Sequence, residues 1–191
     1  YYKDTILVYN GEIYNYLEIR KELKKLGHIF KTTGDTEVLI HALYEWGSNA
    51  LNKLEGMWAF AWYNEVTGST ILSRDRFGEK PLYILSKENG IFFSSEIRGL
   101  KAIAKEPLKV NKNHLLRNLV NGYKSLYKTN DTFFLDVTEL PPGSFLKIDS
   151  KFKKTNGNYW KPKYIVNNNL SYIDSVELTR EAIIKAVSLR M

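Results

Sequence analysis

The residues best suited to chemistry are Asn10 and Gly11, which directly follow a short apolar run, Thr5 to Tyr9. A side-chain amide and a neighbouring glycine N–H that point to one place can stabilise an oxyanion, and glycine lets a substrate approach the backbone. Asn-Gly is also the strongest sequence signal for a type I′ hairpin turn. Against a hairpin, Asn15 and Glu18 follow almost at once and indicate a helix start. The pair therefore has two interpretations, a turn and an oxyanion hole.

Other familiar catalytic patterns are absent from the sequence. It contains no cysteine, and therefore neither a thiolate zinc site nor a cysteine nucleophile. It also lacks a phosphate-binding loop, a dinucleotide fingerprint and a nucleophile-elbow serine. His28, His41 and His114 stand alone, with no second ligand at metal-binding spacing. We therefore predict no metal site.

Composition and charge exclude several classes of partner. The 191 residues carry 28 Lys and Arg against 21 Asp and Glu, and 43% are hydrophobic, as in an ordinary globular domain. The basic residues are scattered, and the densest cluster, Lys151 to Lys154, is predicted to be a solvated hairpin tip. Because nucleic-acid-binding proteins gather such charges on one face, we predict no nucleic-acid partner. The longest apolar run, Trp58 to Tyr63, is too short to cross a membrane, so we predict no membrane partner.

The elements that position these residues follow from periodicity. A buried strand over 5–9 and a helix starting at Asn15 precede a second helix that begins at Asp35. A hairpin follows, and its first arm alternates bulky aromatics with alanines over 58–62, so both of its faces must be covered. We also expect strands over 82–85, 91–94 and 144–148, helices over 96–103 and after Ser171, a loop over 156–158, and a mixed region over 111–136. The fold class is α+β, with one sheet packed between helices and a second sheet.

Six sequence blocks, in order, resemble the glutamine-hydrolysing asparagine synthetases: VYNGEIYNYLEIRKEL, GDTEVLIHALYEWG, LEGMWAFAWYN, RDRFGEKPLY, FFSSEIRGL and LPPGSF. The resemblance is to their N-terminal class II glutamine amidotransferase domain, an N-terminal-nucleophile hydrolase. It implies a four-layer αββα sandwich over residues 1–149, truncated at its N-terminus. It also implies that residues 150–191 are a linker and the first helix leading to an ATP-dependent synthetase domain.

The resemblance implies an activity as well. The amidotransferase domain would hydrolyse glutamine to glutamate and ammonia, and the fused synthetase domain would use ammonia, ATP and Mg to convert aspartate to asparagine. The family's N-terminal cysteine nucleophile and its ATP-binding loop are expected outside these residues. The chain itself is therefore expected to bind no cofactor and to be inactive alone. A cytoplasmic location is implied, and a homodimer of the whole protein is compatible with the family.

Site residues carry over by the same resemblance. Asn10 and Gly11 match the oxyanion pair, Glu12 belongs to the same substrate-contacting segment, and Asp35 matches the acid that holds the α-ammonium of glutamine. Asp35 also suits a plain helix N-cap, and both roles can hold together. We expect Asn10, Gly11 and Asp35 to converge on one cavity.

The block RDRFGEKPLY gathers charged residues in a short loop: Arg74, Asp75, Arg76 and Lys80. Such a loop is more often an ion-pair network that fixes a turn than a catalytic loop, so we predict structural support at the base of the pocket. Met57 and Trp58 are core positions by default. The alternative is that they line a path for ammonia.

Two other functions stay open from the sequence. The first is an amidotransferase of a polysaccharide or secondary-metabolite pathway that acts on another carboxylate. The second is a non-catalytic docking module that keeps the fold. The residue at the nucleophile position would separate enzyme from module, and the acceptor would be decided by the synthetase part of the protein.

Overall fold

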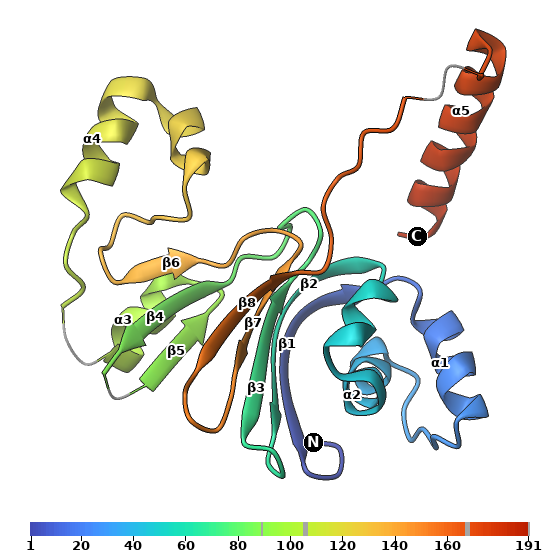
Figure 1. Ribbon diagram of the computed structural model, residues 1–191, viewed down its shortest axis with the longest axis horizontal. Coiled ribbons are helices and arrows are strands. Elements are labelled where there is room, and N and C mark those ends of the chain that lie inside the picture. The colour runs from blue at the N-terminus through green and yellow to red at the C-terminus, as the bar shows by residue number, and fades with distance from the viewer. Residues whose placement is uncertain (89, 105–106, 167–168, 191) are drawn as a thin grey trace.

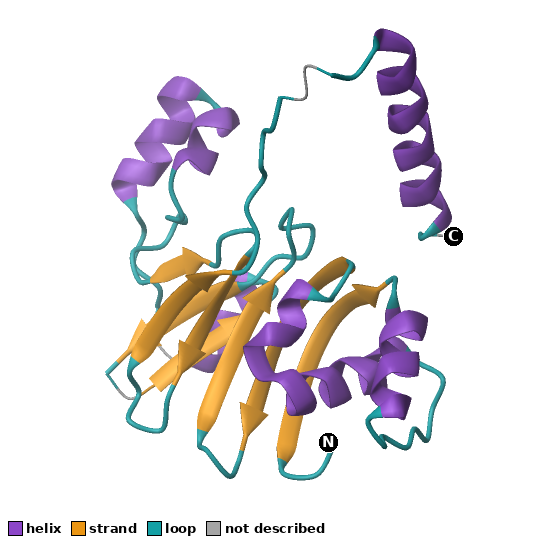
Figure 2. Ribbon diagram, turned by 45° about the vertical axis from the view of Figure 1, so that its right-hand side comes forward, coloured by secondary structure: helices purple, strands orange, loops and turns teal. Residues whose placement is uncertain are grey.

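The computed structural model describes residues 1–88, 90–104, 107–166 and 169–190. Two antiparallel sheets pack face to face, with helices on the outer side of each (Figure 1; Figure 2). The order of layers is α1 and α2, the five-stranded sheet, the three-stranded sheet, and α3. The predicted four-layer αββα sandwich is therefore confirmed.

The larger sheet contains, in spatial order, β1 (Thr5–Ile13), β2 (Gly56–Asn64), β3 (Ser69–Arg74), β7 (Ser144–Ile148) and β8 (Lys154–Asn158). The smaller sheet contains β5 (Gly90–Ser94), β4 (Tyr83–Lys87) and β6 (Val137–Glu139). The helices are α1 (Tyr16–Lys25), α2 (Asp35–Trp46), α3 (Ile97–Ala104), α4 (Lys112–Asn121) and α5 (Tyr172–Ser188), with short 3-10 helices η1 (Gly47–Asn52) and η2 (Tyr123–Lys128).

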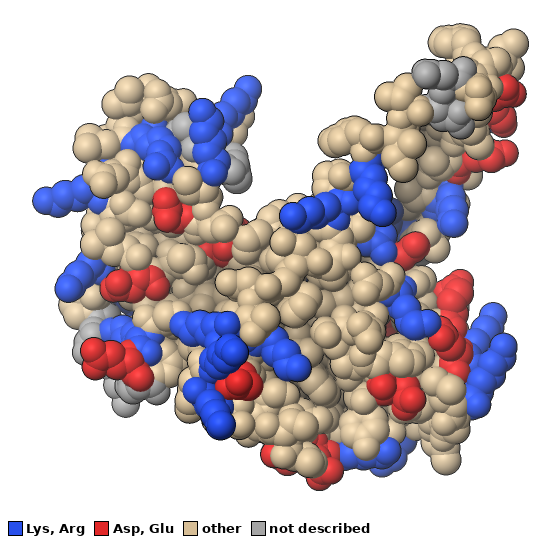
Figure 3. Space-filling view, in the orientation of Figure 1, with Lys and Arg blue, Asp and Glu red and all other residues tan. Residues whose placement is uncertain are grey.

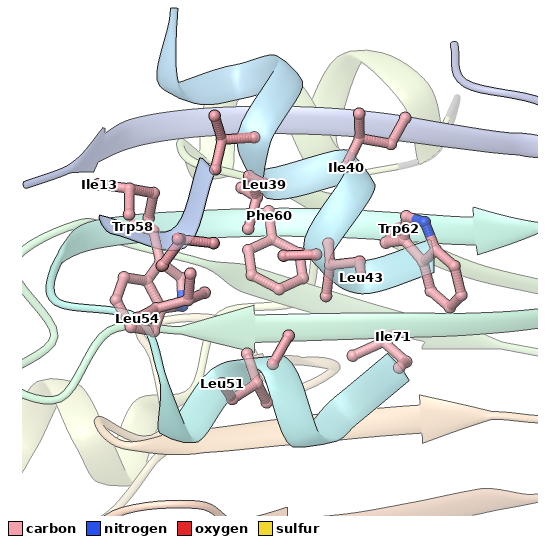
Figure 4. Close-up of a cluster of buried hydrophobic side chains, with 14 of the residues drawn as sticks. Ile13, Leu39, Ile40, Leu43, Leu51, Leu54, Trp58, Phe60, Trp62 and Ile71 are labelled. Atoms are coloured by element: carbon pink, nitrogen blue, oxygen red, sulfur yellow. The ribbon is translucent and has the colours of Figure 1, made fainter. Parts of the chain in front are cut away.

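Strand β2 is buried on both faces, as its alternation predicts. Its aromatic residues Trp58, Phe60 and Trp62 pack against the helices in the cluster drawn in Figure 4. Ala59 and Ala61 point the other way, toward the smaller sheet. Small residues on this inner face let the two sheets approach closely, while each buried aromatic contributes roughly 1.5–3 kcal/mol on the helix side. The β2 pattern therefore sets the order of the layers.

Strand β1 runs four residues beyond its predicted end at Tyr9, to Ile13. Asn10, Gly11 and Glu12 are therefore inside the strand and pair with β2, opposite Ala59, Trp58 and Met57 respectively. Neither a turn nor a strand end occurs at Asn-Gly, and the hairpin interpretation is wrong. The ladder to β2 accounts for this, because it holds the whole segment extended in spite of its weak local strand preference.

A second difference from the sequence prediction is β8, which replaces the expected loop over 156–158. Its residues are polar and mostly exposed, and it forms an edge of the larger sheet by pairing with β7. Backbone hydrogen bonds rather than side-chain burial hold this strand in place. Its sequence therefore shows no alternation of apolar and polar residues from which a strand could be predicted. The larger sheet thus continues past residue 149, and the division of the chain at that residue stays a prediction.

The remaining segments project from the sandwich. Helix α4 with η2 forms one lobe, and α5 follows a long extended connection on the other side (Figure 1). Helix α5 begins as predicted, because the Ser171 side chain accepts a hydrogen bond from the Asp174 N–H at 3.1 Å. None of the described helices has the length and hydropathy needed to cross a membrane. On the face drawn in Figure 3, acidic and basic side chains are interspersed over the body.

Candidate functional site

Asn10 borders a cavity of about 400 Å³ between the two sheets. Its side chain is exposed, and Nδ2 donates a hydrogen bond to Ser95 Oγ at 3.3 Å. The cavity is lined by β1, β2, the end of β5 and the start of α3, and Val8 at its rim is 58% exposed. The Asn10 amide is therefore an accessible hydrogen-bond donor beside an open cavity.

Gly11 is required by the close approach of β1 and β2. A Cβ at this position would lie 2.2 Å from the Met57 carbonyl oxygen, so any side chain would push the strands apart. Neither Gly11 nor Glu12 lines the Asn10 cavity. Glu12 is exposed, and the strand alternation places it on the same face of β1 as Asn10.

Asp35 joins the start of α2 to β1. Its Oδ2 accepts hydrogen bonds from Tyr9 Oη at 2.8 Å and from the Ile13 N–H at 2.9 Å, and its Oδ1 accepts one from Thr36 Oγ1 at 3.3 Å. Burial and this carboxylate raise the pKa of the Tyr9 hydroxyl above its usual value, so it stays a donor. The expected N-cap is not formed, because Gly34 is the N-cap residue.

Asn10 and Asp35 are not brought together. Tyr9, which Asp35 contacts, packs against the helix-side core, whereas Asn10 points to the opposite face of β1, toward Ser95. Asp35 does not line the Asn10 cavity. The expected convergence on one cavity is therefore wrong. The reason is the strand itself, since neighbouring residues of an extended strand point to opposite faces.

The loop after β3 is organised by Asp75, which is fully buried. Its carboxylate accepts hydrogen bonds from four backbone N–H groups, those of Trp58, Phe77, Glu79 and Lys80, at 3.0–3.3 Å. Its own backbone carbonyl accepts from the Gly78 and Gly143 N–H groups. The sequence predicted an ion-pair network in this loop. In the structure, the loop instead folds around a buried carboxylate that accepts hydrogen bonds from backbone N–H groups.

Arg74 is the cation that this loop buries. Its guanidinium donates to the carbonyl oxygens of Lys80, Gly78 and Leu140 at 2.7–2.9 Å and forms an ion pair with Glu139 at 2.9 Å. Arg76 Nη2 donates to the Leu54 carbonyl at 3.0 Å, and Lys80 takes part through its backbone. None of the four predicted support residues lines the Asn10 cavity. Trp58 is fully buried in the helix-side core, which is the default interpretation of that position.

Two partners were not found from the sequence. Ser95 lies in the block FFSSEIRGL, but nothing local links it to Asn10, 85 residues away. His28 and His41 do not stand alone, because their Nδ1 atoms lie 3.1 Å apart. In the described part of the chain, no three His, Cys, Asp or Glu side chains are grouped to hold a metal ion.

A family model described as a glutamine amidotransferase domain matches residues 1–160. The chain belongs to this family. Asparagine synthetase [glutamine-hydrolyzing] 2 of Bacillus subtilis is 31% identical over 190 residues, which are 95% of this chain and 25% of that protein. Putative asparagine synthetase [glutamine-hydrolyzing] 2 of Methanocaldococcus jannaschii is 40% identical over 142 residues, 71% of this chain and 27% of that protein. This chain thus spans about a quarter of the length of these relatives.

Solved structures agree on the fold of the amidotransferase domain. The glutamine phosphoribosylpyrophosphate amidotransferase of B. subtilis superposes with a TM-score of 0.58 at 23% identity, over 83% of this chain and 30% of that one. A similarity at that level of identity bears on the fold alone. It agrees with the four-layer sandwich described above.

Proposed function

We propose that this domain hydrolyses glutamine to glutamate and ammonia within an asparagine synthetase, whose synthetase domain uses the ammonia with ATP and Mg to amidate aspartate. The family match over residues 1–160 and the names of the relatives support the proposal. The structural observation that carries it is the Asn10 amide at the rim of an open cavity. Aspartate is proposed as acceptor because the similar proteins are asparagine synthetases.

The chemistry assigns a role to each residue. A cysteine in the whole protein, N-terminal to Tyr1, would attack the side-chain carboxamide of glutamine, because the 191 residues contain no thiol. Negative charge then develops on the carboxamide oxygen. The Asn10 Nδ2 and the Gly11 N–H would stabilise that oxyanion, and Glu12 would contact the substrate from the same strand. Water would release glutamate after ammonia has left.

Only one carboxylate oxygen of Asp35 is proposed to bind the substrate. Its Oδ2 already accepts two hydrogen bonds from β1, so the α-ammonium of glutamine would be bound by Oδ1, whose described donor is Thr36 at 3.3 Å. A substrate held in this way must extend past the end of β1, since Asn10 and Asp35 lie on opposite faces of that strand. Arg74, Asp75, Arg76 and Lys80 are proposed as structural support outside the substrate's reach.

The experiment is Asn10→Ala in the full-length protein. Glutaminase turnover should fall by roughly 10²–10³, the usual cost of removing one oxyanion donor, because the developing charge loses a fixed hydrogen bond. Asparagine synthesis from free ammonia should persist, since it bypasses this cavity. Asn49→Ala, at an exposed position of η1, is the matched control and should leave both activities unchanged. Equal loss of both activities in Asn10→Ala would assign Asn10 to folding and contradict the proposal.

A further inference from the structure

A hydrogen bond between the two sheets ends on the side chain of Asn10. Its Nδ2 donates to Ser95 Oγ at 3.3 Å, and both residues line the same cavity of about 400 Å³. Asn10 lies on β1 of the larger sheet, whereas Ser95 directly follows β5 of the smaller sheet. The Asn10 amide is therefore tied to the opposite side of the cavity that it borders.

The backbone on both sides of Ser95 is fixed. Ser94 pairs with β4, and its Oγ accepts a hydrogen bond from the Glu96 N–H at 3.2 Å. The Glu96 carbonyl then accepts hydrogen bonds from the N–H groups of Gly99 and Leu100. Leu100 is fully buried, and a Cβ on Gly99 would lie 2.5 Å from Ser94 Oγ, so α3 packs closely on this segment. Ser95 is therefore held in place independently of Asn10.

The amide of Asn10 needs such a fixed partner. Its backbone pairs with Ala59 of β2, but its side chain is exposed and rotates about two bonds. An oxyanion hole is effective when its donors are oriented before the charge develops. Because Nδ2 carries two hydrogens in one plane, the bond from one of them to Ser95 sets the direction of the other.

We propose that Ser95 is a positioning residue for the glutaminase reaction. Its hydroxyl holds one Nδ2 hydrogen of Asn10, so that the second hydrogen is directed at the carboxamide oxygen of glutamine. This inference rests on the proposed function, in which Asn10 stabilises the oxyanion. Ser95 acts through Asn10 alone and does not contact the substrate. Loss of Asn10 removes the donor, whereas loss of the Ser95 hydroxyl keeps the donor but lets it rotate.

The test is steady-state glutaminase kinetics of the full-length protein. Ser95→Ala should lower kcat about threefold to tenfold, the ratio that corresponds to one neutral hydrogen bond, and should keep the KM for glutamine within about twofold. This split is expected because the oxyanion forms only on the way to the transition state, so substrate binding is not weakened. Ser95→Thr keeps the hydroxyl and should keep kcat within about twofold of the unchanged protein.

A double-mutant cycle separates positioning from a direct role of Ser95. Adding Ser95→Ala to Asn10→Ala should lower kcat by no more than about a further twofold, because a positioning residue has no effect once the group that it positions is gone. If the two losses multiplied instead, Ser95 would act on the substrate or on the fold by itself, and the inference would be wrong.

Ser86→Ala is the matched control. Ser86 Oγ on β4 also accepts a hydrogen bond from the larger sheet, from Lys154 Nζ at 2.9 Å, but Ser86 does not line the Asn10 cavity. This variant should leave kcat unchanged, and both serine variants should keep asparagine synthesis from free ammonia.

The outcomes distinguish this inference from the proposed function. An unchanged kcat in Ser95→Ala, an equal loss in Ser86→Ala, or a Ser95→Thr variant as slow as Ser95→Ala would overturn the positioning role and leave the role of Asn10 intact. An unchanged glutaminase turnover in Asn10→Ala would overturn the assigned role of Asn10 and this inference with it.

Discussion

At the scale of single residues, the fold depends on polar groups that are satisfied inside it. Asp75 is buried yet accepts four backbone N–H groups, two on each carboxylate oxygen. Both oxygens of this carboxylate are thus hydrogen-bonded in the interior, as a buried polar group requires. It therefore holds the loop of residues 75–80 against β2, while the Arg74 guanidinium closes the other side through backbone carbonyls.

Asp75→Asn should destabilise the domain by about 2–4 kcal/mol. The amide NH₂ that replaces one oxygen would face backbone N–H groups, so two buried donors would lose their acceptor. Thermal unfolding should show a fall of roughly 5–15 °C. Asp149→Asn is the control, because Asp149 also accepts two backbone N–H groups, from Lys151 and Lys153, but in an exposed turn. Similar shifts for both variants would contradict the role of burial at Asp75.

At the scale of elements, α2 is attached to β1 at its start and to the segment before β1 at its middle. Asp35 at its start bonds to β1, and farther along the helix His41 stacks on Tyr2 with 3.7 Å between ring centroids. His28 Nδ1 lies 3.1 Å from His41 Nδ1, so the two rings are within hydrogen-bonding distance. Burial, and then the charge of His28, lower the pKa of His41 from 6.5 to about 4.

Stability should therefore fall in acid through this element. The unfolded chain protonates His41 near pH 6.5 and the folded chain only near pH 4, so the unfolded state binds more protons between these values. The free energy of unfolding should drop by about 3 kcal/mol as the pH falls from 6.5 to 4, with the loss complete below pH 4. Glu37, Lys3 and Arg20 also act on this group, and Glu37 opposes the lowering.

The measurement is urea unfolding from pH 7 to pH 4 with His41→Phe for comparison. This variant keeps the stack on Tyr2 and removes the titrating group, so its unfolding free energy should depend less steeply on pH, by the amount assigned to His41. Carboxylates titrate in both proteins and cancel in the difference. Parallel pH profiles for the two proteins would show that His41 does not couple folding to protons.

At the scale of the whole molecule, three apolar clusters join the four layers. One lies between α1, α2 and the larger sheet, one between the sheets, and one between the smaller sheet and α3. The projecting helix α5 contributes no buried residue to any of them. The described core is thus built without α5, and the Asn10 cavity lies beside the edge strand β1.

The 191-residue chain by itself should show no glutaminase activity. It offers the amide of Asn10 but no thiol, and hydrogen-bond donors without a nucleophile cannot open a carboxamide. Ammonia release from glutamine, measured with the isolated chain and with a full-length protein, tests this at equal concentration. Turnover by the isolated chain that Ser95→Ala abolished would instead identify a hydroxyl nucleophile beside Asn10.

The sequence by itself determined the layers and the family. Most strands and helices were predicted from periodicity, because burial on one face or both leaves a pattern of apolar residues along the chain. Residues 58–62 are apolar on both faces of the predicted strand, so other elements had to pack on both sides of it. The six sequence blocks indicated the amidotransferase family, which the family match confirms. Local patterns suffice for these features since each depends on residues close in the chain.

Only the tertiary structure decided toward which face of β1 each side chain of the candidate site points. The sequence Asn10-Gly11 is typical of a turn, but pairing with β2 holds both residues in an extended strand. Strand β8 forms by backbone pairing with β7, and such pairing leaves no apolar pattern in the sequence. Extension of β1 through these residues sends the Asn10 amide toward Ser95, while Asp35 reaches the other face of the same strand. Such features arise from contacts between residues far apart in the chain, which no local spacing encodes.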